Sequence, residues 1–361
     1  MRGLALHPNG KYAMIDAPEP RIGENRFAPH DVLIEVELCG ICGSDVHLWG
    51  SGHEGLFGTK RPVVGGHEIV GRVAAVGEKV SAVQVGDRVV CEVANFYCGR
   101  CVNCKQGRFN ICCNVPPIEG RAHYMVGGGF ARYCVWPEAH VHRLPDNVSD
   151  RAAVLMEPTA GAAHGLYERA HVSPGETVVI LGPGARGIIL AQLARAAGAK
   201  TVIVTGVTRD VGVRLPMAKR LADAICVNVD EQDLAEVVRD VTGGIGADVV
   251  VENAGVGAAV NQAIQIARPG GRVVVSGGGI RGGVTAEIDT HPLIVKELTI
   301  YGEISQTWTS WRTAINLVEM GKVQLEPLVT TILPLESWEE GFELAARSPD
   351  VIRVALTPKA G

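Results

Sequence analysis

The sequence predicts an α/β protein with two domains, one rich in β-strands and one built on a doubly wound parallel sheet. A chain of 361 residues is longer than one ordinary hydrophobic core requires. Residues 1–150 hold short strand-like runs broken by Gly and Pro, whereas residues 151–295 alternate apolar strands with alanine-rich helices. Residues 296–361 return to mixed strand and helix. We therefore expect the parallel-sheet domain, 151–295, to be inserted into a first domain made of 1–150 and 296–361.

The first domain is predicted from short apolar runs that end at turn residues. Its strand-like stretches are "DVLIEVEL", "EIVGRVAAVG" and "DRVVCEVA". Such runs, separated by Gly, Pro and Asp, are typical of an all-β barrel or sandwich. Near the C-terminus, "WRTAINLVEMGK" has the periodicity of an amphipathic helix.

The second domain is predicted from strands that alternate with helices. In order, these are "ETVVILG" then "ARGIILAQLARAAGA", "KTVIVTG" then "RLPMAKRLADA", "ADVVVENAG" then "AAVNQAIQIA", and finally "GRVVVSGG". Strands that are apolar along their whole length are buried on both faces, as in a sheet covered by crossover helices. The pattern therefore indicates βαβ units and a parallel sheet.

The composition of the chain argues against some kinds of binding partner and some cellular locations. Hydrophobic residues make up 47% of the chain and charged residues 20%, with a net charge of −5. No basic stripe is present, so we expect neither nucleic acid nor an anionic membrane surface as a partner. The N-terminus reaches charge and proline too early for a signal peptide, and no apolar run is long enough to span a bilayer. We therefore expect a cytoplasmic protein whose ten cysteines stay reduced.

Four cysteines with regular spacing predict a metal site. Cys98, Cys101, Cys104 and Cys112 form a C-x2-C-x2-C-x7-C arrangement. Four thiolates on one loop can surround Zn²⁺ with no open position, which is the design of a structural site. An iron–sulfur cluster is the main alternative, because thiolates suit both. Cys113 is adjacent and is the residue most easily confused with a ligand.

A glycine-rich turn predicts dinucleotide binding. Gly182, Gly184 and Gly187 have G-x-G-x-x-G spacing, directly after a predicted strand and at the start of a predicted helix. Glycines allow a tight turn and a close approach of the backbone to a pyrophosphate, which the helix N-terminus attracts. We therefore assign this turn, with Ala185 and Arg186 inside it, to coenzyme binding.

The end of the second strand bears on the choice between NAD and NADP. An acid there would accept from the ribose 2′-OH and repel a 2′-phosphate, but the chain has Thr205 or Gly206 at this position, followed by Arg209 with Asp210 beside it. An arginine can pair with a phosphate, which favours NADP slightly over NAD, while a solvated turn is an equally good interpretation of Arg209. The ends of two later strands complete the predicted cofactor-binding set with Ala254 and Gly277.

A second set of residues has the ligand types of a catalytic zinc site. Cys42 lies in "CGICGSDVH", His67 and Glu68 in "GGHEIVG", and Glu157 in "VLMEPTAGAAHG". A thiolate, an imidazole and a carboxylate can bind Zn²⁺ and leave one position for water or substrate. Each motif alone is weak, since a His-Glu pair is more often a surface pair.

These motifs together resemble the zinc-dependent medium-chain dehydrogenases, most closely the sorbitol (polyol) and threonine dehydrogenase branch. The motifs "CGICGSDVH", "GGHEIVG", "VGDRV", the four-cysteine loop, "EPTAGAAH", "GPGARG" and "PLVT" occur in the family's order. The resemblance implies a GroES-like catalytic domain, 1–150 with 296–361, and a Rossmann domain, 151–295. It also implies a zinc-dependent enzyme that transfers hydride between a secondary alcohol or polyol and NAD(P).

The resemblance further implies a role for each site residue. Cys42 and His67 would bind the catalytic zinc, Glu68 would be a direct or exchanging ligand, and Glu157 would bind directly or through water. Zinc would act as a Lewis acid on the substrate hydroxyl, and hydride would pass to C4 of the nicotinamide. The family's proton-relay positions correspond to Ser44 and His47.

Substrate recognition is less well defined by the sequence. Trp49, His53 and Trp308 are candidates to line the substrate site, although each could equally be a core residue. Animal sorbitol dehydrogenases have an arginine where this chain has Ser305 or nearby Gln306, so the alcohol cannot be inferred from that position. The alternatives are an L-threonine or butanediol dehydrogenase, a non-catalytic nucleotide-sensing or structural protein of the same fold, and a zinc-independent reductase of the same superfamily. The resemblance also suggests a homodimer or homotetramer.

Overall fold

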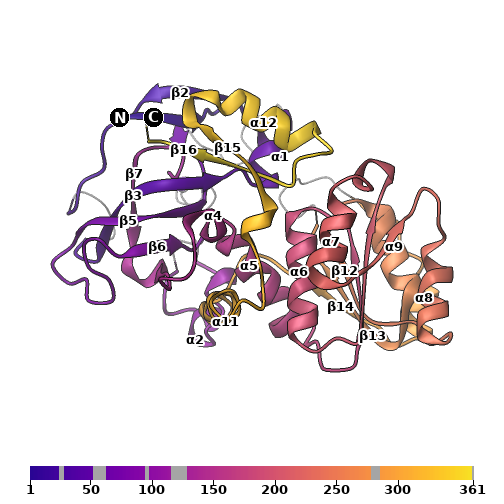
Figure 1. Cartoon of the computed structure of the whole chain (residues 1–361). Coiled ribbons are helices and arrows are strands. Elements are labelled where there is room, and N and C mark those ends of the chain that lie inside the picture. The colour runs from indigo at the N-terminus through magenta and orange to yellow at the C-terminus, as the bar shows by residue number, and fades with distance from the viewer. Residues whose placement is uncertain (24–27, 52–61, 94–96, 115–127, 278–284, 360–361) are drawn as a thin grey trace. The chain divides into compact units, whose positions relative to one another are not determined.

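The structure is a computed structural model that describes residues 1–23, 28–51, 62–93, 97–114, 128–277 and 285–359 (Figure 1). Contacts within the chain divide it into two compact units. Unit 1 consists of Met1–Pro158, Ser305–Trp308 and Leu325–Gly361, and unit 2 of Thr159–Ile304 and Thr309–Gln324. Among the described residues, no helix is both long enough and apolar enough to cross a membrane.

Unit 1 is rich in β-structure. Its first sheet has the strand order β2-β1-β4. Its second has the order β15-β16-β3-β5-β6-β8, with β7 paired to β3. The strands are β1 Arg2–Leu6, β2 Tyr12–Asp16, β3 Asp31–Gly40, β4 Val63–Val64, β5 Glu68–Val76, β6 Arg88–Cys91, β7 Tyr133–Pro137, β8 Val141–Arg143, β15 Val329–Pro334 and β16 Arg353–Thr357.

The inward faces of these strands form the core of unit 1. Alternation along β7 buries Cys134 and Trp136, as expected for a strand with one face on a core. Trp136 Nε1 donates to the carbonyl oxygen of Glu92 at 2.9 Å, so its polar atom is satisfied inside the core. Phe130 and Phe342 are also fully buried and their rings meet edge to face.

The helices of unit 1 are short and flank the sheets. Helix α12 packs against β16 and β15, and α1 packs against α12. The 3₁₀ turns η1, η2, η5 and η6 span Phe109–Ile111, Glu138–His140, Glu326–Leu328 and Leu335–Ser337. The helices are α1 Gly43–Ser51, α2 Val102–Lys105, α4 Asp150–Ala153, α12 Trp338–Arg347 and α5 Met156–Ala163, which continues into unit 2.

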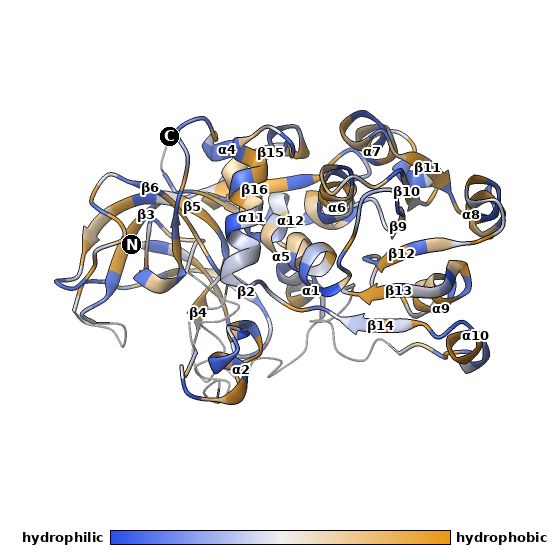
Figure 2. Cartoon of the chain, turned by 90° about the horizontal axis from the view of Figure 1, so that it is seen from below, coloured by the Kyte–Doolittle hydropathy of each residue, from blue (hydrophilic) through white to orange (hydrophobic). Residues whose placement is uncertain are grey.

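Unit 2 is built on a six-stranded sheet with the order β11-β10-β9-β12-β13-β14. Every neighbouring pair in it is parallel. All five residues of β9 are buried, and the carboxyl end of β13 is coloured as hydrophobic in Figure 2. The strands are β9 Thr177–Leu181, β10 Thr201–Gly206, β11 Ile225–Asn228, β12 Ala247–Glu252, β13 Ala267–Val275 and β14 Thr299–Gly302.

The helices of unit 2 fall into two groups. Helix α6 packs on β9 and β10 and α7 on β10 and β11, whereas α9 packs on β12 and β13 and contacts α8. Because the crossovers run first toward β11 and later toward β14, right-handed connections place the two groups on opposite faces. The helices are α6 Ala185–Ala196, α7 Arg214–Ala222, α8 Leu234–Thr242, α9 Gly257–Ile266, α10 Thr290–Val295 and α11 Trp308–Glu319, with η3 His164–Arg169, a π-helix, and the 3₁₀ turn η4 Thr208–Asp210.

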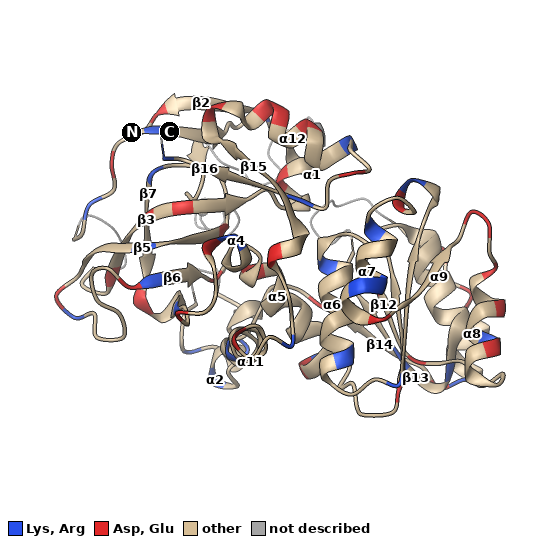
Figure 3. Ribbon diagram, in the orientation of Figure 1, with Lys and Arg blue, Asp and Glu red and all other residues tan. Residues whose placement is uncertain are grey.

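Local sequence explains where individual helices begin and end. Helix α8 begins at Asp233, whose carboxylate accepts from the backbone N–H of Ala235 at 2.8 Å, and it ends at Gly243 in the left-handed conformation. These are the preferred N-cap and C-cap residues of an α-helix. Figure 3 shows acidic and basic residues interspersed along the ribbons of both units.

The contact division differs from the predicted domain limits after residue 295. Strand β14 adds to β13 in the parallel sheet of unit 2, and most of α11 also belongs to unit 2. Gln192 of α6 holds the end of this segment, because its side chain exchanges two hydrogen bonds with the backbone of Gln324. The helical periodicity of 311–322 predicted α11, but periodicity alone does not predict which of the two units a helix packs against.

Candidate metal centres and dinucleotide-binding turn

Three predicted metal ligands come together in unit 1. Cys42 follows strand β3 and precedes α1, and His67 immediately precedes β5. Strands β3 and β5 are antiparallel, with Gly40 opposite Glu68. This register brings the ligand atoms of Cys42, His67 and Glu68 within 4.8 Å of one another.

The chemistry of this group fits a zinc ion. Among the described residues, His67 Nδ1 and Glu68 Oε2 are shielded from solvent and have no hydrogen-bond partner. Buried polar atoms without partners cost free energy, which binding to a metal removes. Burial alone would lower the pKa of His67, but Cys42 and other nearby acidic groups raise it well above its ordinary value. The surroundings of the imidazole therefore favour positive charge.

The two carboxylate oxygens of Glu68 have different surroundings: one accepts from Arg353, and the other has no hydrogen-bond partner among the described residues. Arg353 Nη1 donates to Glu68 Oε1 at 3.0 Å and to the carbonyl oxygen of Ile41 at 2.7 Å, and both side chains are buried. The other oxygen, Oε2, lies where a side chain at Gly40 would begin, since a Cβ there would be 2.1 Å away. Glycine at this position is therefore required by the carboxylate.

The turn that carries Cys42 is fixed by Asp45. Its Oδ2 accepts from the backbone N–H of Cys42 at 2.9 Å, and its Oδ1 accepts from the hydroxyl of Tyr12 at 3.1 Å. Asp45 is almost completely buried, and this burial raises the pKa of its carboxyl group. The side chain thus holds the turn in place.

Glu157 is not among the residues whose ligand atoms all lie within 4.8 Å of one another, but its charge acts on His67. It is buried near the start of α5, and Gln306 Nε2 donates to its Oε1. Burial raises the pKa of Glu157 to about 7. Gln306 is presented by Ser305, whose φ of 60° lies in the left-handed region that non-glycine residues seldom adopt. The sequence marked Gln306 only as standing near a missing arginine, and not as the partner of Glu157.

The two predicted relay residues lie on helix α1. Ser44 is buried and His47, one turn later, is exposed. Within the described part of the chain, Ser44 Oγ has no hydrogen-bond partner. The order from buried hydroxyl to exposed imidazole is the one that a proton path to solvent requires.

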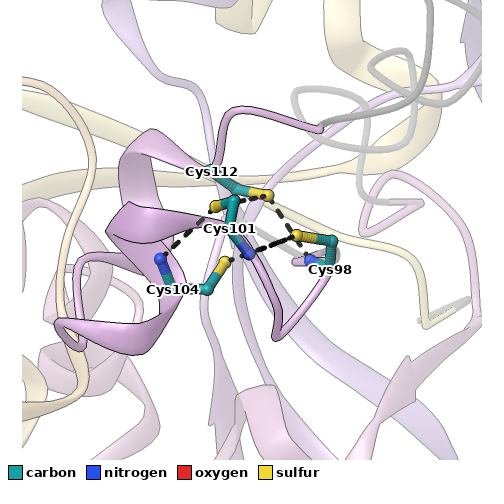
Figure 4. A group of neighbouring side chains, drawn as sticks. All are labelled: Cys98, Cys101, Cys104 and Cys112. Atoms are coloured by element: carbon teal, nitrogen blue, oxygen red, sulfur yellow. Dashed lines mark hydrogen bonds between the residues drawn. The ribbon is translucent and has the colours of Figure 1, made fainter.

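The four-cysteine loop forms a second, separate group. The sulfur atoms of Cys98, Cys101, Cys104 and Cys112 all lie within 4.8 Å of one another (Figure 4). Cys98 and Cys104 are 3.9 Å apart, and Cys101 and Cys112 are 4.0 Å apart. Zn–S bonds of about 2.3 Å in a tetrahedron separate sulfurs by roughly 3.8 Å. The spacing therefore fits one tetrahedral ion.

Backbone N–H groups of this loop donate hydrogen bonds to the cysteine sulfur atoms, which stabilises the thiolate form. Cys101 donates to the sulfur of Cys98 at 3.3 Å, and Cys104 to that of Cys101 at 3.4 Å. Hydrogen bonds from the backbone N–H groups of Cys104 and Cys113 lower the pKa of Cys101 to about 6. The thiol of Cys113 is exposed and accepts from Asn103 Nδ2, outside the group of four.

The glycine-rich turn follows β9 directly. Gly182 has a φ of 106°, and a Cβ on Gly187 would lie 2.0 Å from the carbonyl oxygen of Gly182. Gly184 is the N-cap of α6, has open space where a side chain would begin, and provides no side-chain cap. The first N–H groups of α6, including those of Ala185 and Arg186, therefore fit an anionic group such as a pyrophosphate.

In the loop after β10, the basic side chain of Arg209 is exposed to solvent and the acidic side chain of Asp210 is buried. Strand β10 ends at Gly206, where a Cβ would be 2.9 Å from Pro183 and 3.0 Å from Asp210. Asp210 is buried and pairs with Arg214 at 3.0 Å, whereas Arg209 is exposed. No acidic side chain can occupy position 206 without displacing these neighbours.

The last predicted cofactor-binding residues lie at the carboxyl ends of two central strands. Ala254 follows β12, and Gly277 follows β13. Glu252 joins the two loops, because its Oε1 accepts from the N–H of Gly255 at 2.6 Å and its Oε2 from that of Gly277 at 3.2 Å. Ligands of doubly wound sheets bind at this edge.

The candidate substrate residues have different surroundings. Trp49 packs against the core of unit 1 with its ring 5.7 Å from that of Phe342, and Trp308 is exposed. His53 lies outside the described residues. Trp308 is therefore the more exposed of these two tryptophans.

Comparisons with known proteins agree with these observations. Residues 28–146 match the family model of the alcohol dehydrogenase GroES-like domain, and residues 186–320 match that of the zinc-binding dehydrogenase. D-arabitol-phosphate dehydrogenase of Enterococcus avium is 34% identical over 95% of this chain and 94% of its own. Sorbitol dehydrogenase of Halalkalibacterium halodurans is 34% identical over 98% and 97%. A solved structure of a proposed zinc-binding dehydrogenase from Sinorhizobium meliloti, bound to NADP, is 30% identical, with a TM-score of 0.85 over 99% of both chains.

The family models, the relatives and the fold give one result. Unit 1 contains the GroES-like domain, and unit 2 contains the parallel-sheet dinucleotide-binding fold. The fold class predicted from the sequence is therefore confirmed. The chain belongs to the zinc-dependent medium-chain alcohol dehydrogenases, in the branch that includes the polyol dehydrogenases.

Proposed function

We propose that this enzyme uses zinc to transfer hydride between a secondary alcohol or polyol and NAD(P). The observation that carries the proposal is the group formed by the thiol of Cys42, the imidazole of His67 and the carboxylate of Glu68. The same chain has a glycine-rich turn before helix α6, where no side chain caps the helix N-terminus. The names of the sorbitol and D-arabitol-phosphate relatives support a polyol as substrate.

Each site residue has a proposed task. Cys42, His67 and Glu68 hold the catalytic zinc, with Glu68 restrained by Arg353, and Glu157 adds a direct or water-mediated ligand. Zinc supplies Lewis-acid activation of the substrate hydroxyl. The side chains of Ser44 and His47 carry the released proton toward solvent, from a buried position to an exposed one.

A second zinc would stabilise the loop of Cys98, Cys101, Cys104 and Cys112. All four ligand positions of a tetrahedron are supplied by this loop, which leaves none for substrate. We therefore assign this ion a structural role. It would hold together a segment that has only helix α2 and a 3₁₀ turn as regular structure.

The coenzyme is proposed to bind the turn of Gly182, Gly184 and Gly187, with its adenosine ribose at Gly206. The sequence leans toward NADP, and two features of the loop support that choice. The side chain of Arg209 is exposed. The carboxylate of Asp210 is buried and forms an ion pair with Arg214. The similar structure from Sinorhizobium meliloti was solved with NADP.

A homo-oligomer is proposed from the edge of the parallel sheet. In the described part of unit 2, strand β14 pairs only with β13. Ile294 and Val295, on the adjoining helix α10, are 69% and 61% exposed, and Ile300 and Ile304 are also exposed. An apolar edge strand is a template for pairing with a second copy. We also propose a cytoplasmic location, where ten cysteines would stay reduced.

The test is a substrate panel with purified protein. Polyols, secondary alcohols, L-threonine and butanediol are offered with NAD⁺ and with NADP⁺, and reduced nicotinamide is followed by absorbance. We expect turnover of a polyol that chelation abolishes and zinc restores. Turnover of L-threonine or butanediol alone would replace the polyol assignment, and binding of coenzyme without turnover of any alcohol would favour a non-catalytic protein.

A further inference from the structure

An arginine inside the dinucleotide turn is tied to the ends of three strands of unit 2. Arg186 Nη1 donates to Asn253 Oδ1 at 2.8 Å and to Ser276 Oγ at 2.7 Å, and Nη2 donates to Glu303 Oε2 at 2.5 Å. These partners follow β12, β13 and β14. The side chain of Glu303 is only 4% exposed and that of Arg186 22%, so this is a largely buried ion pair.

The strand order indicates which half of the coenzyme this pair faces. The chain leaves β9 toward β10 and β11 and later returns to β12, β13 and β14, so the topological switch point lies between β9 and β12. Doubly wound folds bind one mononucleotide half on each side of this point, with the pyrophosphate at the first turn. Because the adenosine half belongs to the side of β10, the Arg186 partners lie on the side of the nicotinamide half.

The two forms of the coenzyme differ in charge on this half. The oxidised nicotinamide ring carries a positive charge, and the reduced ring is neutral. A nearby guanidinium therefore disfavours the oxidised form, and a nearby carboxylate favours it. Two opposite charges held together, as in the Arg186–Glu303 pair, largely cancel.

We propose that Arg186 and Glu303 neutralise each other beside the coenzyme site, so that neither charge biases its relative affinity for oxidised and reduced nicotinamide. The inference rests on the proposed coenzyme function and adds to it a specific role for both side chains. Neither residue is required to touch the substrate, so each acts as a positioning residue for charge around the ring. Glu252 adds a buried carboxylate at the neighbouring loops, and it is unchanged in every variant below.

The experiment measures dissociation constants instead of turnover. Reduced coenzyme is titrated by its fluorescence, and oxidised coenzyme by displacement of the reduced form, for the wild type, Arg186→Gln, Glu303→Gln and the double variant. Glu303→Gln leaves Arg186 uncompensated and should raise the ratio Kd(oxidised)/Kd(reduced). Arg186→Gln leaves Glu303 uncompensated and should lower it. We expect roughly a fivefold change each way, the order of magnitude for one uncompensated, partly screened charge near the ring.

The double variant and a matched ion pair serve as controls. With both charges removed, the ratio should return to the wild-type value. Arg268 and Asp248 form a comparable pair at 2.6 Å near the amino ends of β12 and β13, and Arg268→Gln should leave the ratio unchanged.

Opposite shifts in the two single variants support the proposal, because a purely structural role would weaken both forms together. Equal ratios in all variants would overturn it while leaving the proposed function intact. If the wild type binds no nicotinamide coenzyme, both are overturned. Should Arg186→Gln fail to fold, the direction of the Glu303→Gln shift decides.

Discussion

At the scale of single residues, Glu68 illustrates how position within the fold determines the chemistry of a side chain. One carboxylate oxygen accepts from Arg353, and the other lies against Gly40, within the group of Cys42 and His67. The buried guanidinium supplies the positive charge that a carboxylate needs when it is removed from water. Arg353 therefore compensates the burial of the Glu68 carboxylate.

Replacing Arg353 should destabilise the protein strongly. Arg353→Met leaves the buried carboxylate of Glu68 without its partner, and we expect a loss of about 3 kcal/mol in the free energy of unfolding. Urea denaturation of the zinc-loaded protein measures it. The double variant Arg353→Met/Glu68→Gln should lose less than the sum of the two single changes. An unchanged denaturation midpoint for Arg353→Met would show that the pair contributes nothing.

Arg209 should determine the use of NADP. If its exposed guanidinium pairs with the 2′-phosphate, Arg209→Ala should raise KM for NADP⁺ by roughly tenfold or more and leave KM for NAD⁺ almost unchanged. Steady-state kinetics with both coenzymes measures this, with Arg239→Ala, on an exposed face of α8, as the control. Equal changes for both coenzymes would mean that Arg209 does not recognise the phosphate.

At the scale of elements, Glu92 joins two parts of the β-rich unit. It lies just after β6, and its two carboxylate oxygens pair with His140 Nδ1 at 2.9 Å and with His142 Nε2 at 2.8 Å, in η2 and β8. Burial alone would raise the pKa of Glu92, but the hydrogen bonds from the two histidines outweigh it and hold the pKa below its ordinary value.

This arrangement predicts how stability depends on pH. A carboxyl group whose pKa is lowered by folding stabilises the protein above its unfolded pKa, and that contribution is lost as the pH falls through the folded value. The difference in melting temperature between the wild type and Glu92→Gln should therefore be largest near neutral pH and shrink as the pH drops below about 4.5. Glu236→Gln, at an exposed site, should show no such trend. A difference independent of pH would contradict the assignment.

The sequence predicted individual helices and strands better than it predicted their contacts. The strands and helices of 151–295 have strong periodicity, and the turn of Gly182 to Gly187 falls where its spacing predicts. The pairing register of β3 and β5, which brings Cys42 to Glu68, depends on contacts far apart in sequence and could not be predicted from periodicity. The same is true of Gln306, which meets Glu157 across 149 positions.

At the scale of the whole molecule, the exposed edge of unit 2 should form a subunit interface. Ile300→Lys places a charge on edge strand β14 and should convert the homo-oligomer into smaller species, because lysine on an edge strand opposes pairing with another chain. Sedimentation velocity or light scattering measures the mass. Ile245→Lys, at another exposed apolar position of unit 2, is the matched control. An unchanged mass for Ile300→Lys would place the interface elsewhere.

The two groups of proposed ligands should hold two zinc ions with different tasks. The groups of Cys42, His67 and Glu68 and of the four cysteines are separate in sequence and share no residue. Loss of one group should therefore not empty the other. Cys42→Ala should abolish turnover and leave the structural ion, whereas Cys101→Ser should remove the structural ion and lower the melting temperature.

The measurement that tests this most directly is the zinc content of the purified wild type and of Cys42→Ala, determined by elemental analysis beside the dehydrogenase assay. We expect about two zinc ions per active wild-type chain and about one per inactive Cys42→Ala chain. A wild type with about one zinc and no turnover, or a Cys42→Ala variant that keeps both its zinc and its activity, would contradict the assignment of Cys42, His67 and Glu68 as the catalytic metal site.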